Sequence, residues 1–179
     1  MRVIQIVRIT ILLVALGCAV WAIIHYRQDH RFAGKGFQPT WQVLSVHDGD
    51  TITVRQGDRS EKIRFACLDA PELSQPLGKA SRDNLRKLID KAGDRVSLQI
   101  LNTDRYGRKV AEVYTIHPKQ LLQEAQIKSG FAYVYHQYLN NCPDATLVKR
   151  AEAIARCKGA GVWHDPNSIK PWNYRHTKV

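Results

Sequence analysis

Within a short stretch, residues 46–72, four of the carboxylates and one of the arginines stand at spacings that could build a site. The carboxylates belong to Asp48, Asp50, Asp69 and Glu72, and the arginine is Arg64. Two carboxylates that lie close together repel each other unless a cation sits between them, and hard oxygen ligands suit Ca²⁺ or Mg²⁺. Asp50 and Asp69 are therefore candidate metal ligands. Glu72 follows a proline that stiffens the backbone, so its carboxylate could stay off the metal and act as a base.

Strands are needed to bring these side chains together. The pattern predicts strands at residues 41–47 and 51–55, joined by an Asp48-Gly49 turn, and a third strand at 61–68. Three antiparallel strands of this length would place the two candidate ligands at the same end of a sheet. Turn chemistry alone would also explain the first two acidic residues, Asp48 and Asp50. Two further acidic residues, Asp69 and Glu72, follow the third strand, and they make a metal site the better interpretation.

Four motifs occur in a fixed order along the chain. They are Asp48-Gly-Asp-Thr51, Arg64, Asp69-Ala-Pro-Glu72 and Asp104-Arg-Tyr-Gly-Arg108. In this order and spacing they resemble the staphylococcal nuclease (thermonuclease) family, and the resemblance extends from about residue 42 to residue 163. It implies an α+β fold, a five-stranded OB-type β-barrel with three helices. It also implies Ca²⁺-dependent hydrolysis of phosphodiester bonds in DNA and RNA.

The resemblance also implies a role for each site residue. The Ca²⁺ ligands would be Asp50, Asp69, the backbone carbonyl of Ala70 and, through a bound water, Asp48, for which a turn role is the alternative. Glu72 would accept a proton from the attacking water. Arg64 and Arg108 would bind the phosphate, because a guanidinium matches two of its oxygens and keeps its charge. The aromatic residues flanking the nucleotide would be Tyr106, Tyr133 and Tyr135, with core packing the alternative for at least one.

The remaining pattern completes one nuclease domain at residues 41–164. Further strands are expected at 94–101 and 109–114, and helices at 80–91, 119–128 and 144–158. Residues 165–179 are expected to form a loosely packed basic tail. The formal net charge of the chain is +11, and most of it lies beyond the first thirty residues. Such an excess favours a polyanionic partner, nucleic acid or an acidic membrane surface.

The N-terminal residues 1–26 are typical of a signal anchor or a signal peptide. A nearly uninterrupted apolar run at 9–24 follows Arg2 and Arg8. Because the run continues past Cys18, an uncleaved transmembrane anchor is favoured over cleavage or lipid attachment. Either outcome exports the domain to the periplasm or the extracellular space, and cleavage would make it secreted. Residues 27–40 are expected to be a linker. No protein partner is indicated, and a monomer is expected.

The cysteines do not indicate a disulfide framework or a zinc site. Cys67 is expected to be a core residue. Cys142 and Cys157 could pair in an oxidising compartment, but the predicted helix between them would hold them about 20 Å apart, whereas a bridge requires about 7 Å or less. Two other functions remain possible: a catalytically inactive nucleic-acid-binding OB domain, and a membrane-bound interaction protein. An active nuclease is favoured because the chain keeps all five principal residues, the two candidate metal ligands, the base and both arginines.

Overall fold

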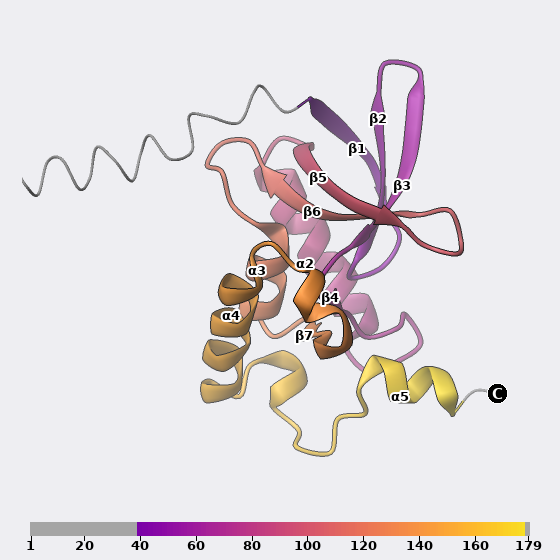
Figure 1. Cartoon of the computed structure of the whole chain (residues 1–179). Coiled ribbons are helices and arrows are strands. Elements are labelled where there is room, and N and C mark those ends of the chain that lie inside the picture. Colours follow the sequence, from indigo (N-terminus) through magenta and orange to yellow (C-terminus); the bar gives the residue numbers. More distant parts are fainter. Residues whose placement is uncertain (1–38, 178–179) are drawn as a thin grey trace, which may run out of the picture. The chain divides into compact units, whose positions relative to one another are not determined.

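The computed structural model describes residues 39–177 (Figure 1). The expected signal or anchor segment, 1–26, and nearly all of the expected linker lie outside the described residues. Among the residues that are described, no helix is both long enough and apolar enough to cross a membrane.

Five strands close into the expected barrel, in the order β1-β2-β3-β6-β5. The strands are β1 (Thr40–Val46), β2 (Thr51–Gln56), β3 (Arg59–Phe65), β5 (Arg95–Thr103) and β6 (Lys109–Thr115). All neighbouring pairs are antiparallel except β3 and β6, which are parallel. Side chains alternate along each strand, so that residues such as Ile52, Val54, Ile63 and Phe65 fill the barrel interior. The five-stranded α+β barrel predicted from the sequence is thus confirmed.

The third predicted strand ends earlier than expected. The chain turns at Cys67, whose φ is 70°, and leaves the barrel as β4 (Leu68–Asp69). There it pairs with β7 (Tyr133–Val134) in a separate two-stranded sheet. This turn carries Asp69 away from the barrel wall and back towards the start of β2, where Ala70 bonds Asp50.

The three predicted helices are present within a few residues of their expected bounds. They are α2 (Gly78–Lys91), α3 (Leu122–Lys128) and α4 (Ala145–Cys157). Each helix buries an apolar face, which on α2 includes Leu85 and Ile89. Two short 3₁₀ helices, η1 (His136–Asn141) and η2 (Gly161–Trp163), were not predicted.

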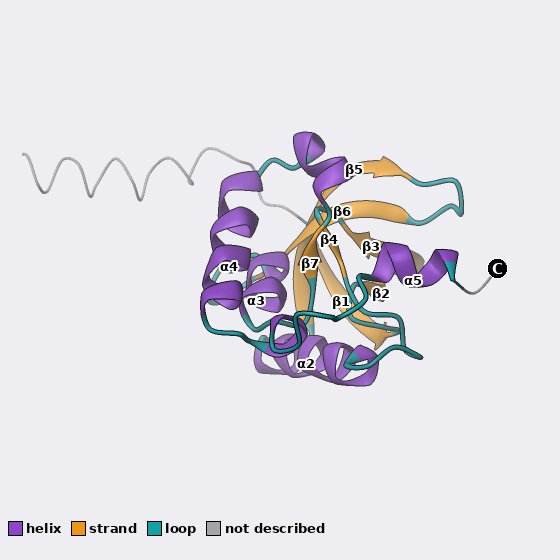
Figure 2. Cartoon of the chain, turned by 90° about the horizontal axis from the view of Figure 1, so that it is seen from below, coloured by secondary structure: helices purple, strands orange, loops and turns teal. Residues whose placement is uncertain are grey.

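The C-terminal segment is not the loosely packed tail that its composition suggested. It forms α5 (Pro171–His176), whose first residue is buried. Figure 2 shows α3 and α4 on one side of the β4–β7 pair and α5 on the other. The Gln75 side-chain amide donates a hydrogen bond to the backbone carbonyl of Ile169 at 3.0 Å, and the Tyr174 hydroxyl bonds the carbonyl of Ser74 at 3.2 Å. These contacts fix α5 against the loop that follows β4.

A disulfide joins Cys67 to Cys142, with 5.8 Å between their Cα atoms. Cys67 is a buried core residue, as expected, but its bridge to Cys142 was not predicted, and the disfavoured pair of Cys142 with Cys157 does not form. Cys157 is exposed and has a free thiol at the end of α4. Cys142 pairs with Cys67 and not with Cys157 because η1, which ends just before Cys142, packs beside the turn between β3 and β4. Helix α4 carries Cys157 away from Cys142.

Candidate active site

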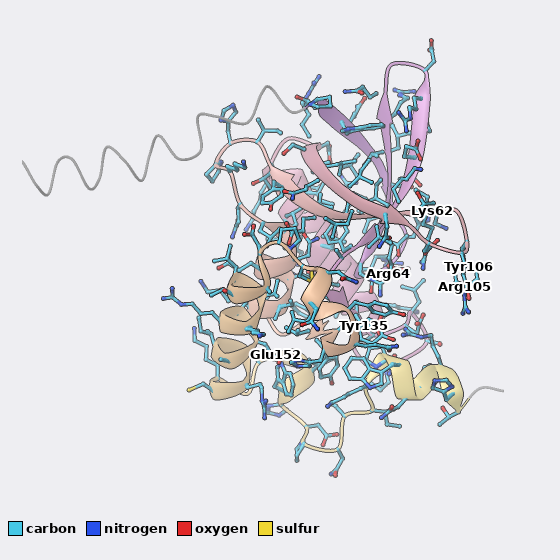
Figure 3. The ribbon with its side chains drawn as sticks, in the orientation of Figure 1. Lys62, Arg64, Arg105, Tyr106, Tyr135 and Glu152 are labelled. Carbon is cyan, nitrogen blue, oxygen red and sulfur yellow. A yellow bond between two sulfur atoms is a disulfide. The ribbon has the colours of Figure 1, made fainter. Side chains whose placement is uncertain are left out.

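A cleft of about 1360 Å³ opens on one side of the barrel. It is surrounded by the start of β2, the end of β3, the β5–β6 loop, η1 and α5. The predicted carboxylates and both predicted arginines line it: Asp48, Asp50, Arg64, Asp69, Glu72 and Arg108. In Figure 3, Arg105 and Tyr106 lie at the tip of the β5–β6 loop, and Tyr135 lies on the other side of Arg64. The tertiary structure therefore brings together residues from four separate sequence motifs.

Arg64 lies between the two candidate metal ligands. The β2–β3 register pairs Arg64 with Thr51, which places the guanidinium beside Asp50. One guanidinium nitrogen lies 2.8 Å from Asp50 Oδ2, and the other lies 2.6 Å from Asp69 Oδ1. Both carboxylates are buried. The Arg64 guanidinium thus lies between the two buried carboxylates, where their charge requires a cation.

Asp50 is the most electrostatically perturbed acid of the cleft. Burial is the main cause that raises the pKa of Asp50 to about 8; Arg64 opposes the shift, and the negative charges of Asp48 and Asp69 add to it. The backbone N–H of Ala70 donates a hydrogen bond to Asp50 Oδ2 at 2.8 Å, which favours the ionised form. A carboxylate in such surroundings gains from a further cation.

Asp48 forms the turn that its sequence suggested. Its Oδ1 accepts the backbone N–H of Asp50 at 2.9 Å. Gly49 lies between them and approaches α2 so closely that a Cβ there would meet Ser81 Oγ at 1.9 Å. The Gln126 side chain donates a hydrogen bond to the Gly49 carbonyl at 3.1 Å. These contacts set the position of the whole acidic loop, and the water-mediated role of Asp48 stays a prediction.

Arg175 on α5 is a site residue that the sequence analysis missed. It bonds Asp69 Oδ2 at 2.7 Å and Glu72 Oε1 at 2.8 Å. Partial burial lowers the pKa of Arg175, but the hydrogen bonds to these two carboxylates outweigh burial and raise it, so the guanidinium stays charged. A proline at the first helical position, Pro171, followed by basic residues in the last turn, was the available signal for this helix.

Arg108 is held by its own turn. Its Nε lies 2.7 Å from Asp104 Oδ2, and its backbone N–H donates to Asp104 Oδ1 at 2.9 Å. Partial burial raises the pKa of Asp104, but hydrogen bonds from Arg108 and Tyr106 outweigh burial and hold it below its usual value. The guanidinium groups of Arg105 and Arg108 lie 4.8 Å and 5.6 Å from the exposed Tyr106 ring centroid. This loop offers positive charge and an aromatic face to the cleft.

The three predicted stacking tyrosines differ in exposure. Tyr106 and Tyr135 line the cleft, whereas Tyr133 is only 3% exposed. The Tyr133 ring packs edge-on against Trp163 at 5.0 Å, so it is a core residue and its expected stacking role does not fit this structure. Tyr135 stacks on Trp172 of α5, with 5.4 Å between centroids and 8° between planes. Core packing, the alternative weighed for one tyrosine, applies to Tyr133.

The donor set fits a hard divalent cation. Among residues 39–177, no group of three or more His, Cys, Asp or Glu side chains is arranged to hold a metal. The two carboxylates of Asp50 and Asp69 nevertheless share one cation, Arg64, and the Ala70 N–H donates to Asp50 Oδ2, while the Ala70 carbonyl as a ligand stays a prediction. Two carboxylates and a main-chain carbonyl are ligands that Ca²⁺ accepts, with water or substrate oxygens completing its coordination.

The sequence matches a family model described as "Staphylococcal nuclease homologue" over residues 62–165, a segment that contains Arg64, Asp69, Glu72 and Arg108. The chain belongs to the staphylococcal nuclease family. It is 36% identical over 137 residues to an uncharacterized endonuclease of Haemophilus influenzae, covering 76% of this chain and 72% of the relative. It is 30% identical over 151 residues to a micrococcal nuclease of Shigella flexneri, covering 76% and 83%. The chain is therefore a nuclease, an enzyme that hydrolyses phosphodiester bonds.

Proposed function

We propose that this protein is a Ca²⁺-dependent nuclease of DNA, RNA or both, exported and held at the membrane by its N-terminal segment. The observation that carries the calcium assignment is the pair of buried carboxylates, Asp50 and Asp69, that share one cationic group at 2.6–2.8 Å. The acid on the rim of the same cleft, Glu72, is partly exposed and accepts a hydrogen bond from Arg175. These residues supply two oxygen ligands and a base, the groups that metal-assisted hydrolysis uses.

The residues divide the work of hydrolysis between them. Asp50, Asp69 and the Ala70 carbonyl would hold the ion, which when bound would neutralise charge that develops on the phosphoryl oxygens. Glu72 accepts a proton from the attacking water. Arg64 and Arg108 bind the phosphate oxygens, and since neither can lose its charge they stabilise the transition state electrostatically.

The aromatic residues of the cleft support a nucleic-acid substrate. Tyr106 is exposed and Tyr135 lines the cleft, and stacking of a base on such a ring is worth about 1–3 kcal/mol whatever the base. A nuclease with these contacts would accept many sequences. An inactive binding domain is disfavoured because the metal ligands, the base and both arginines all line one cleft.

Export is supported by the disulfide as well as by the N-terminal apolar run. Bonds such as Cys67–Cys142 form and persist in oxidising compartments and are rare in the cytosol. If the N-terminal run is an uncleaved anchor, the full-length protein should fractionate with membranes and resist carbonate extraction. A mature N-terminus mapped at or beyond Cys18 would instead show that the segment is processed.

The calcium assignment is tested by incubating the full-length protein with single- and double-stranded DNA and RNA. Cleavage should require Ca²⁺ and stop when a calcium chelator is added. Mg²⁺ should substitute poorly, because it demands an octahedral geometry that two carboxylates and a carbonyl do not ensure. Undiminished cleavage in excess chelator would refute the metal assignment.

The role of Glu72 is tested by Glu72→Gln, which keeps the shape of the side chain and removes the basic carboxylate. Turnover should fall by about 10²–10⁴ while nucleic-acid affinity holds steady or rises, because one negative charge leaves a cleft that faces phosphate. Asp58→Asn removes the same charge from the exposed β2–β3 turn and should change neither quantity. Arg108→Ala should weaken both binding and turnover. Turnover of Glu72→Gln at the unmutated rate would exclude Glu72 as the base.

A further inference from the structure

We infer that Arg175 of α5 is a displaceable counter-ion of the metal site, which neutralises Asp69 and Glu72 until Ca²⁺ takes its place. The inference rests on the calcium part of the proposed function. Arg175 lies beyond residues 62–165, the segment that matches the family model. Through Arg175, the affinity of the site for its metal would depend on the C-terminal helix α5 as well as on the barrel.

The contacts of the two candidate metal ligands show which positively charged side chains would compete with a bound cation. Asp50 Oδ2 forms an ion pair with Arg64 at 2.8 Å, and Asp69 Oδ1 accepts a hydrogen bond from Arg64 at 2.6 Å. Asp69 Oδ2 accepts from Arg175 at 2.7 Å, and Asp69 Oδ1 accepts a second bond from Arg175 at 3.2 Å. Asp69 thus faces two guanidinium groups at once, and a divalent cation bound there would meet the positive charge of both.

Arg175 is the guanidinium better able to leave. The Arg64 side chain is 14% exposed, projects from the barrel wall and also bonds the Phe65 carbonyl. The Arg175 side chain is 41% exposed and comes from a short helix at the edge of the cleft. A long exposed side chain gains rotamer freedom and hydration when it leaves an ion pair, so the cost of displacing Arg175 is the smaller of the two.

Displacement of Arg175 also changes Glu72. The same guanidinium that binds Asp69 holds Glu72 Oε1 at 2.8 Å. When Ca²⁺ replaces it at Asp69, the Glu72 carboxylate loses this donor and becomes available to a water molecule. Metal binding and release of the base are therefore coupled through one side chain.

The helix itself is held by contacts that do not involve Arg175. Trp172 stacks on Tyr135, the Tyr174 hydroxyl bonds the Ser74 carbonyl, and Pro171 is buried. Substitutions at Arg175 should therefore leave α5 in place, and their effects can be assigned to the guanidinium.

The test is calorimetric titration of Ca²⁺ into the full-length protein, without substrate, for the unmutated chain and for Arg175→Gln, Arg175→Lys and Arg150→Gln. Arg150 is exposed on α4, outside the cleft, so its substitution removes the same charge from elsewhere on the domain. Arg175→Gln should bind Ca²⁺ about three- to tenfold more tightly, as expected when a partly exposed competing ion pair is lost. Arg175→Lys should fall between, because an ammonium cannot bridge both carboxylates as the guanidinium fork does.

Two results would overturn the inference. If the unmutated chain binds Ca²⁺ and Arg175→Gln binds it no more tightly than Arg150→Gln, Arg175 does not compete with the ion, and the proposed function stands. If neither the unmutated chain nor Arg175→Gln binds Ca²⁺, the calcium assignment falls and the inference falls with it.

Discussion

Replacing both Cys67 and Cys142 by alanine should lower the free energy of unfolding by about 4 kcal/mol. The disulfide joins residues separated by 75 positions. Closing a loop of that length removes chain entropy from the unfolded state, worth about 4 kcal/mol near 25 °C on the loop-entropy estimate. For a domain of this size the loss corresponds to a fall in Tm of roughly 8–16 °C.

The assay is urea unfolding followed by circular dichroism, with and without a reductant, after thiol titration has established the redox state. The unmutated protein should lose stability in reductant, and the double alanine variant should be insensitive to it. Cys157→Ser is the matched control, because Cys157 is an exposed free cysteine, and its midpoint should not move. An unmutated protein that is fully reduced by titration yet unfolds at an unchanged urea midpoint would refute the reasoning.

The disulfide should also matter for the cleft. Cys67 lies two residues before Asp69, and Cys142 directly follows η1, so the bridge ties η1 to the strand that carries a candidate metal ligand. Below its Tm, the double alanine variant should therefore show a raised KM with a smaller change in kcat. Equal KM values for the two proteins would show that η1 keeps its position without the bridge.

Three further predictions follow from separate parts of the structure. Tyr114→Phe removes a hydroxyl that donates hydrogen bonds to Glu112 at 2.8 Å and to Asp144 at 2.7 Å, and whose pKa is raised mainly by burial. The free energy of unfolding in urea should fall by about 1.5–3 kcal/mol, and an unchanged midpoint would contradict this. Gly49→Ala should cost about 1–3 kcal/mol and lower activity, because its Cβ would meet Ser81 Oγ at 1.9 Å and displace the acidic loop; full activity would show that α2 yields instead. Substrate affinity should fall steeply with salt, with a slope of log affinity against log salt of about −0.7 to −0.9 for each phosphate contacted; a flat profile would exclude phosphate binding as the main contribution.

Local patterns in the amino-acid sequence determined much of this protein by themselves. The alternation of apolar residues indicated the five barrel strands and the helical faces, because side-chain direction repeats with the period of each element. Asp48-Gly-Asp50 and Asp69-Ala-Pro-Glu72 combine turn chemistry with acidic side chains over four residues or fewer, so a short stretch of sequence is enough to identify them. With Arg64 and Arg108 they also indicated the family to which the chain belongs.

Only the tertiary structure decided which distant side chains meet. Arg175 bonds Asp69 across 106 positions, and Cys67 pairs with Cys142 across 75. Tyr133 is buried because Trp163 packs against its ring. Periodicity fixes the face of an element on which a side chain lies, but not the element that will cover that face. That choice depends on how β4, η1 and α5 pack around the barrel, and it is there that a basic tail becomes a wall of the active-site cleft.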